Sequence, residues 1–354
     1  MPMTTMSGGG QDGPRPGRAT MRDVAALAGV SLKTVSRVVN DEAGVSRDLR
    51  DKVTQAVERL NYRPNLTASN LRRSRGGTGV IGALLQDVSN SFSSSLLRVL
   101  EDTARSRHGV VLAASLDEEA ERERALVADL VSRRVDGLIL MPATHEHSYL
   151  AAEVRAGLPT VFVDRTPHGV GADSVVVDNR KGAREATRHL LALGHRRIAH
   201  LADLAEIETA AQRLAGYEAA LHSAGLQVDP ALVATGLRTS EAAEEALVHM
   251  LRIEEPPTAI FASRNTLSIG TIRLLRKVGL SHRVAVVGFD DFPLADLMDP
   301  ALTVVRQNVI SLGRHASELL FARIDGDTSP PKHIVIAPTL VARGSGEIPP
   351  PRRR

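Results

Sequence analysis

Short apolar runs alternate with helical patterns from residue 78 onward, and this alternation restricts most of the chain to one fold class. The runs at residues 80–85, 110–113, 137–141, 160–163, 198–201, 259–261 and 284–289 have the length and composition of buried strands. Helical spacing of apolar residues occupies 94–107, 119–132, 180–192, 212–224, 241–251 and 268–277. Strands that alternate with helices form parallel sheets covered by helices on both faces, so we expect an α/β fold.

The length of this α/β region indicates two lobes. Residues 78–345 are too many for one compact sheet, and the series of strands and helices begins again near residues 175–178. Residues 1–18 contain five Gly and three Pro without a periodic apolar face, which predicts a disordered leader. The Gly- and Pro-rich residues 346–354 predict a disordered tail in the same way.

Residues 19–64 have a different, all-helical pattern. Thr20 can cap a first helix that carries Val24, Leu27 and Ala28, and a Gly-Val turn at 29–30 leads to a second helix that begins after Ser31. A third helix follows Ser46. Three short helices with Gly in the first tight turn indicate a helix-turn-helix domain.

Charge is distributed unevenly along the chain. Residues 1–78 contain 13 Lys and Arg against 7 Asp and Glu, whereas residues 79–354 contain 31 against 34. A basic head on an acidic body is typical of a protein that binds a polyanion at one end. No stretch is apolar for the roughly 18 residues of a membrane span, and no apolar signal segment precedes the head, so we expect a cytoplasmic protein without a membrane partner.

The second helix of the head has the residues of a DNA-reading surface. Leu32, Lys33 and Arg37 face outward, and an Arg can bind guanine through two hydrogen bonds. Short polar side chains suited to phosphate oxygens accompany them, namely Ser31, Thr34, Ser36 and Asn40. The alternative is a solvated face on a structural three-helix domain.

Enzyme chemistry has little support in the chain. Cysteine is absent, which excludes disulfides, thiol nucleophiles and Cys-containing metal sites. The His145-Glu146-His147 run has no clear third ligand and reads as a solvated loop. No nucleophile-elbow, P-loop or dinucleotide-binding motif is present. We therefore expect no catalytic activity, metal or cofactor.

Long matches give the chain a family resemblance. Residues 21–40 and 60–65 closely resemble the head of the LacI/GalR family of bacterial repressors, and the resemblance continues through 132–139, 193–199, 213–217, 287–291 and 302–307. It covers about residues 20–345. The resemblance implies a helix-turn-helix head at 19–64, a hinge segment at 65–77 and a two-lobed core at 78–345 that is similar to periplasmic sugar-binding proteins.

In that family the hinge segment becomes a helix only on DNA. By resemblance Leu71 is the wedge that enters the minor groove, with Asn65, Ala68 and Arg72 beside the same DNA. An apolar wedge can kink a duplex, and a marginal helix can order on binding. A plain flexible linker is the alternative.

The resemblance also places an effector in a cleft between the lobes. It implies three crossovers near Val177, Arg306 and Pro330, hence an N-lobe of 78–177 plus 307–330 and a C-lobe of 178–306 plus 331–345. The matched pocket positions, together with residues that directly follow strands, are Asn90, Ser91, Phe92, Asp164, Thr209, Arg213, Arg264, Asp290 and Gln307. Any of them could instead be structural; either Asp290 or Asp291 could cap a turn.

Two departures from the family pattern bear on the effector. The usual Pro and second aromatic of the pocket loop are missing from residues 90–93, which weakens stacking on a sugar ring. Arg264-Asn265 replaces a common Asn-Asp pair, which favours a carboxylated or phosphorylated effector unless Arg264 turns into solvent. A sugar, sugar acid or phosphosugar is thus the expected ligand class.

The sequence as a whole predicts an effector-responsive repressor of carbohydrate-related genes that binds a pseudo-palindromic operator as a homodimer. A regulator that answers to a nucleobase or another non-sugar metabolite, and a DNA-binding protein without an effector, are the alternatives. A transport sugar-binding protein would need an export signal and no DNA-binding head, so that class fits poorly.

Overall fold

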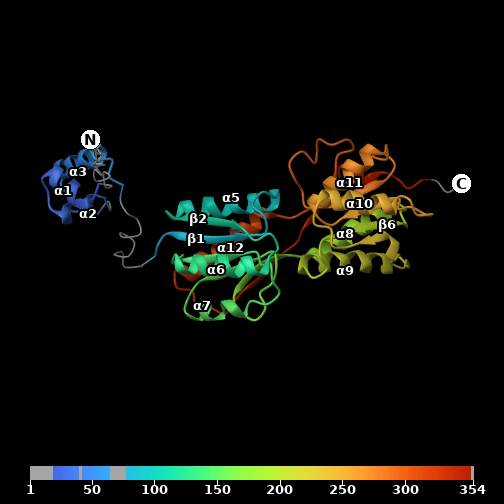
Figure 1. The fold of residues 1–354 in the computed structure, drawn as a ribbon, viewed down its shortest axis with the longest axis horizontal. Helices are drawn as coiled ribbons and strands as arrows, with labels where there is room; N and C mark the ends of the chain where they lie inside the picture. Colours follow the sequence, from blue (N-terminus) through green and yellow to red (C-terminus); the bar gives the residue numbers. More distant parts are fainter. Residues whose placement is uncertain (1–18, 40–41, 64–76, 352–354) are drawn as a thin grey trace, which may run out of the picture. The chain divides into compact units, whose positions relative to one another are not determined.

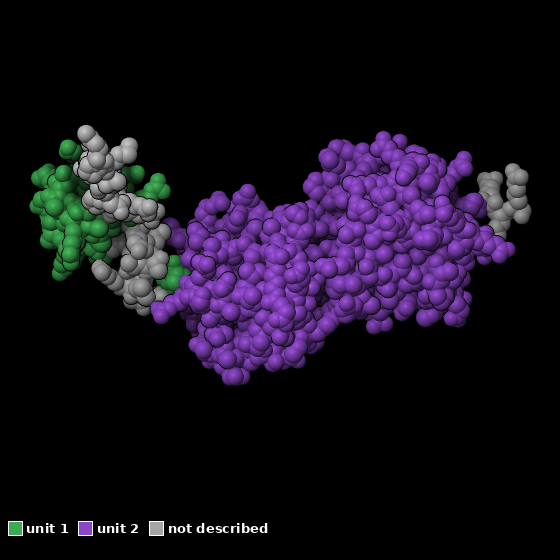
Figure 2. Space-filling view, in the orientation of Figure 1, with its two compact units in different colours: residues 1–78 green, residues 79–354 purple. Residues whose placement is uncertain are grey.

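The computed structural model describes residues 19–39, 42–63 and 77–351, which form two compact units at residues 1–78 and 79–354 (Figure 2). The predicted leader at 1–18 and the hinge residues 65–76 lie outside the described residues. No described helix combines the length and apolar character that a membrane span needs.

The first unit contains three helices around a small apolar core, as the helical spacing predicts. They are α1 (Met21–Ala28), α2 (Leu32–Val39) and α3 (Arg47–Arg59). Thr20 caps α1 in a reciprocal capping box with Asp23, and Gly29 takes a left-handed φ of 64° that lets the chain turn sharply. The buried core consists of Val24, Ala25, Val35, Val53, Ala56 and Tyr62.

One of the apolar residues that the first helix carries lies on its surface. Leu27 is 44% exposed, whereas Ala25, two residues earlier, is buried. Only one face of the eight-residue α1 meets the core, and its buried residues are Val24 and Ala25. Leu27 therefore lies on the surface.

The second unit contains two six-stranded sheets, one in each lobe (Figure 1). The N-lobe sheet has the order β11-β5-β4-β3-β1-β2, and the C-lobe sheet has the order β12-β10-β9-β8-β6-β7. The N-lobe strands are β1 (Val80–Leu85), β2 (Val110–Ser115), β3 (Gly137–Leu140), β4 (Thr160–Val163), β5 (Asp173–Val177) and β11 (His333–Ile336). The C-lobe strands are β6 (Ile198–Leu201), β7 (Val233–Ala234), β8 (Ala259–Ala262), β9 (Ala285–Phe289), β10 (Thr303–Arg306) and β12 (Thr339–Val341).

Helices cover both faces of each sheet and bury a core on either side (Figure 1). In the N-lobe, α5 (Ser91–Ser106) and α12 (Val309–Ile324) cover one face, whereas α6 (Ala120–Ser132) and the short α7 (Ala151–Arg155) cover the other. In the C-lobe, α8 (Asn179–Ala192) and α9 (Glu208–Ser223) lie opposite α10 (Ser240–Met250) and α11 (Asn265–Lys277). Every predicted strand and helix is present, with ends shifted by at most four residues.

The chain passes between the lobes three times. The first two crossovers follow β5 and β10, as expected near Val177 and Arg306. The third does not fall at Pro330, because residues His333–Ile336 pair in parallel with β5 and so extend the N-lobe sheet. This crossover lies between β11 and β12 instead, and β12 runs antiparallel to β10, so the C-lobe sheet is not wholly parallel.

The segment expected to begin a disordered tail is folded onto the C-lobe. Residues Ser345–Glu347 form a short 3-10 helix, and both Ser345 and Gly346 are buried. The Ser345 hydroxyl accepts from the Thr303 amide at 2.9 Å and donates to the Val286 carbonyl at 2.6 Å. The prediction of disorder is therefore wrong through residue 351, and residues 352–354 lie outside the described part of the chain.

The buried Ser345 hydroxyl gives a stability prediction. Ser345→Ala leaves a buried amide and a buried carbonyl without their partner, so we expect the free energy of unfolding of the core to fall by about 1–3 kcal/mol. Urea unfolding of the full chain, followed by far-UV circular dichroism, measures this. Ser223→Ala, at the exposed end of α9, is the matched control and should change little; equal stability of Ser345→Ala and the parent would contradict the packing of the segment.

Candidate functional site

The first unit presents a basic groove along α2. Leu32, Lys33 and Arg37 are exposed, as predicted, and they share this groove with Arg22 from α1. Arg37 Nε lies 3.7 Å from the Glu42 carboxylate, and both side chains are about half exposed. The arrangement places several cationic donors on one surface beside the N-terminus of a helix, a combination suited to binding a polyanion.

The short polar residues of α2 have more local roles than the sequence suggests. The Ser31 hydroxyl accepts from the Thr34 amide at 3.1 Å and lies 2.9 Å from the Thr34 hydroxyl, so both residues contribute to the start of the helix. Ser36 lines the basic groove. The remaining predicted DNA contacts lie outside the described residues: Asn40, Asn65, Ala68, Leu71 and Arg72.

The second unit contains a small polar cavity between its lobes. Its volume is about 50 Å³, room for a few water molecules. Eight predicted effector residues line it, namely Asn90, Phe92, Asp164, Thr209, Arg213, Arg264, Asp290 and Gln307. The ninth, Ser91, lines an adjoining groove that shares Phe92, Asp290 and Gln307 with the cavity.

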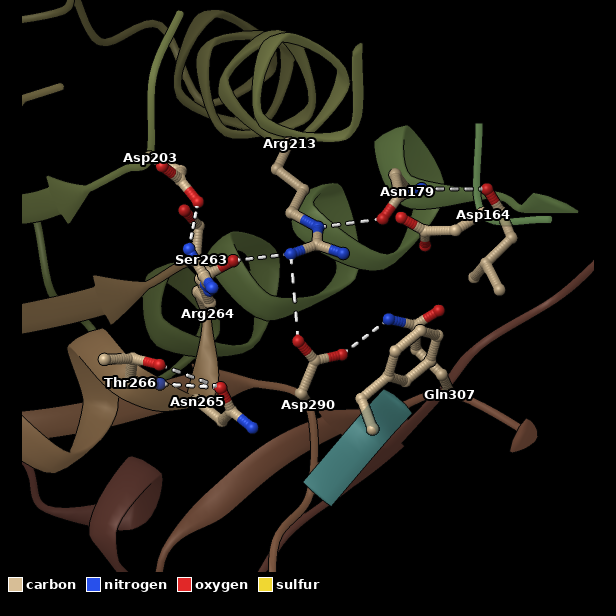
Figure 3. A network of polar contacts seen from close by, with 12 residues as sticks. Asp164, Asn179, Asp203, Arg213, Ser263, Arg264, Asn265, Thr266, Asp290 and Gln307 are labelled. Carbon is tan, nitrogen blue, oxygen red and sulfur yellow. Dashed lines mark hydrogen bonds and ion pairs between the residues drawn. The ribbon is translucent and has the colours of Figure 1, made fainter. Parts of the chain in front are cut away.

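Arg213 of α9 is the central cation of this cavity (Figure 3). Its Nε donates to Asn179 Oδ1 at 2.8 Å and its Nη1 to the Ser263 carbonyl at 2.7 Å. The Asp290 carboxylate lies 3.9 Å from Nη1, and the Phe289 ring centre lies 3.8 Å from the guanidinium carbon. Burial lowers the pKa of Arg213, yet these partners hold the guanidinium in one orientation.

Asp164 and Asp290 occupy equivalent places in the two lobes. Each directly follows a strand in the left-handed region, with φ of 72° and 73°, and each donates its amide to the neighbouring strand. A non-glycine residue in this conformation costs energy and is common at binding sites, where surrounding contacts enforce it. The two carboxylates therefore meet the cavity from opposite lobes.

Charge in the cavity is paired. Arg165 binds Glu118 through two short bonds of 2.5 and 2.6 Å, and its Nε lies 3.8 Å from Asp164. Arg264 contacts the Asp203 carboxylate, so it faces the cavity but is neutralised there (Figure 3). This pairing removes the argument for an anionic effector that rested on the Arg264-Asn265 replacement.

Gln307 supplies an unused acceptor at the same place. Its Nε2 donates to Asp290 at 2.5 Å, whereas its Oε1 is buried without a hydrogen-bond partner in the described part of the chain. Buried acceptors are normally satisfied, so Oε1 is suited to accept from a hydroxyl or amine group of a bound molecule.

Direct hydrogen bonds between the lobes surround the cavity. Asn90 and Asn265 exchange amide bonds of 3.1 Å in both directions, and Asn265 also donates to Ser91. Glu208 of α9 accepts from the Thr166 amide and hydroxyl at 2.9 and 2.8 Å. An Asp at position 265 could not donate these bonds, which gives the departure from the family pattern a physical role in holding the lobes closed.

Sequence reasoning missed two carboxylates of the cavity, Glu118 and Asp203. Both follow strands closely, β2 in one case and β6 in the other, so the rule that ligands meet strand ends could have found them. Asp291, by contrast, binds Arg343 at 2.6 and 2.8 Å and does not line the cavity.

Burial of Asp164 predicts a pH effect on stability. Burial raises its pKa to about 6, against the opposing pull of Arg165 and Arg213. Between the usual Asp value of 3.8 and about 6, the folded chain binds more protons than the unfolded chain, so this group's contribution to stability falls as pH rises. Asp164→Asn should remove that fall. As pH rises through this window, the free energy of unfolding of the variant minus that of the parent should increase by about 1.4 kcal/mol per pH unit.

Urea unfolding of parent and variant at pH 4, 5, 6 and 7 measures the difference. Asp102→Asn, on the exposed surface of α5, is the control and should show no such slope. A stability difference between Asp164→Asn and the parent that is flat with pH would show that Asp164 ionises normally in the folded protein.

Comparisons with known proteins agree with this architecture. Residues 20–65 match "Bacterial regulatory proteins, lacI family", and residues 78–343 match "Periplasmic binding proteins and sugar binding domain of LacI family". The chain is 36% identical over 328 residues to the HTH-type transcriptional regulator GalS of Salmonella typhimurium, which covers 92% of this chain and 96% of that protein.

Two solved structures match most of the chain. A complex of the transcriptional regulator CelR with cellobiose is 32% identical, has a TM-score of 0.68 and covers 93% of this chain and 100% of that one. The lac repressor dimer bound to operator and the anti-inducer ONPF is 28% identical, has a TM-score of 0.80 and covers 93% and 99%. The helix-turn-helix head, the two-lobed core and these matches show that the chain belongs to the LacI family of bacterial transcriptional regulators.

Proposed function

We propose that this repressor binds operator DNA as a dimer and responds to a neutral, hydroxyl-rich effector held between its lobes. The charge balance of the cavity is the observation that supports a neutral effector. Each of the three arginines that line it lies within ion-pair distance of a carboxylate, and the lining holds four carboxylates in all. A phosphate or carboxylate would have to displace one of these carboxylates, whereas hydroxyl groups can bind between them.

The donors and acceptors are arranged to grip hydroxyl groups from both sides. Asp164 of the N-lobe and Asp290 of the C-lobe accept, Arg213 donates, and Gln307 Oε1 accepts. Phe92 at the cavity edge offers an apolar surface to a sugar ring. The cellobiose complex of a relative supports a carbohydrate, and a nucleoside or nucleobase is the alternative.

Binding at this site is coupled to lobe movement. A cavity of about 50 Å³ is too small for a sugar, so the lobes must part where Asn90 meets Asn265 and where Thr166 meets Glu208. An effector shifts the equilibrium between two arrangements of the lobes only if it binds one arrangement more tightly than the other. We propose that this difference reaches the DNA-binding head through the residues that join it to the core.

Calorimetry on the full chain tests the effector class. Neutral sugars should bind, whereas sugar acids, phosphosugars and nucleosides should not. Arg213→Lys keeps the charge but loses the planar fork, so we expect at least tenfold weaker sugar binding with operator affinity of the free protein unchanged. Arg273→Lys, exposed on α11, is the matched control.

Each other result identifies a different function. Binding of anionic sugars alone would refute the neutral effector, and binding of nucleosides alone would favour the alternative ligand class. Failure of every ligand to bind would favour a repressor without an effector.

An exposed apolar patch on the C-lobe suits a dimer interface. Leu294 and Leu297 are 65% and 75% exposed, and they line a groove with Ile269, Ile272 and Met298. Large apolar side chains that gather on a surface mark contacts with another chain. A second copy fits best, because a relative of similar fold is a dimer on its operator.

Leu297→Asp should therefore produce a monomer and weaken operator binding at least tenfold, because two heads no longer bind together. Analytical ultracentrifugation and gel-shift titration measure the two effects. Leu193→Asp, at a separate exposed apolar position of the same lobe, is the control; a Leu297→Asp dimer of parental affinity would place the interface elsewhere.

A further inference from the structure

The surface of α2 begins with an apolar side chain. Leu32, the first residue of the helix, is 46% exposed. It lines the basic groove with Arg22, Lys33, Ser36 and Arg37. A leucine contributes nothing to charge attraction, but on a surface that meets a duplex it can pack against an apolar group of the bases.

Helix geometry separates this apolar side chain from the cations. Leu32 and Ser36 are four residues apart and form one strip of α2, and Lys33 and Arg37 form the adjoining strip. The Glu42 carboxylate lies 3.7 Å from Arg37 in the second strip. When the start of α2 meets a duplex, an apolar contact and cationic contacts therefore fall side by side.

The major groove offers one apolar group to such a side chain. Guanine and adenine present ring and exocyclic acceptors or donors, cytosine presents an amino donor, and only thymine presents a methyl group, at its C5 position. A leucine pressed on the polar edges would bury them without hydrogen bonds, which is costly. Contact with a thymine methyl has no such cost and removes apolar surface from water.

We propose that Leu32 reads a thymine in each operator half-site through its C5-methyl group, next to bases that the Lys33 strip contacts. The inference rests on the proposed DNA-binding function and adds to it a chemical requirement on the operator. Deoxyuridine differs from thymidine only by this methyl group, so it removes the contact and leaves base pairing intact.

The experiment uses the full chain and an operator selected from random duplexes. Each half-site thymine is replaced in turn by deoxyuridine, symmetrically in both half-sites, and affinity is measured by fluorescence anisotropy. Loss of one buried methyl is worth about fourfold per half-site, so we expect about 15-fold weaker binding at one symmetric position. Leu32→Ala should bind the thymine operator more weakly than the parent and be indifferent to deoxyuridine at that position.

A matched control separates the contact from general damage to the head. Leu27→Ala removes a similarly exposed leucine on α1 that does not line the groove, so it should keep the parental sensitivity to deoxyuridine. Circular dichroism melts confirm that both variants fold.

Every other outcome overturns the inference. If no thymine position responds to deoxyuridine while the unmodified operator binds well, DNA binding stands and the methyl contact is refuted. The same holds if Leu32→Ala remains as sensitive as the parent, because another residue then makes the contact. If no duplex is enriched at all, the proposed function fails and this inference falls with it.

Discussion

The burial of Arg213 governs the arrangement of the cleft. A guanidinium with only 6% of its residue surface exposed cannot rely on water, so the fold must surround it with acceptors. It obtains them from the start of α8, the end of β8 and the residue after β9, and it stacks on the last residue of β9. These contacts hold three segments of the C-lobe around the Arg213 side chain. Asp164 of the N-lobe lines the same cavity.

Part of the site follows from one rule about parallel sheets, and the other predicted residues came from the family resemblance. Because strand ends of a parallel sheet meet at the same edge, the first one or two residues after a strand locate Asp164, Asp290 and Arg264 around one cavity. The same rule reaches Glu118 and Asp203 once the loops after β2 and β6 are included. The ion pairs of the cavity could not be predicted from the sequence. Arg264 contacts a carboxylate 61 residues away, and a local sequence pattern does not indicate which way either side chain points.

Segments that depend on distant partners were the ones predicted poorly. β11 is an edge strand with every second residue exposed, so its short apolar alternation was too weak to assign to a sheet before its pairing with β5 was seen. The Gly- and Pro-rich stretch after β12 is ordered by Ser345 and Glu347, which hydrogen-bond Thr303 more than 40 residues earlier. Local composition indicates disorder there because it contains no information about such contacts.

The triple passage between lobes has a consequence for how the protein is made. The N-lobe face built by β1, β3 and α5 is completed by α12, whose Leu312, Ala316 and Leu320 lie in its core, and by β11 at the sheet edge. Both elements leave the ribosome after the whole of residues 178–306. During translation the nascent N-lobe therefore carries an uncovered apolar face and an unpaired strand edge, which makes it a candidate client for chaperones until α12 and β11 have been synthesised.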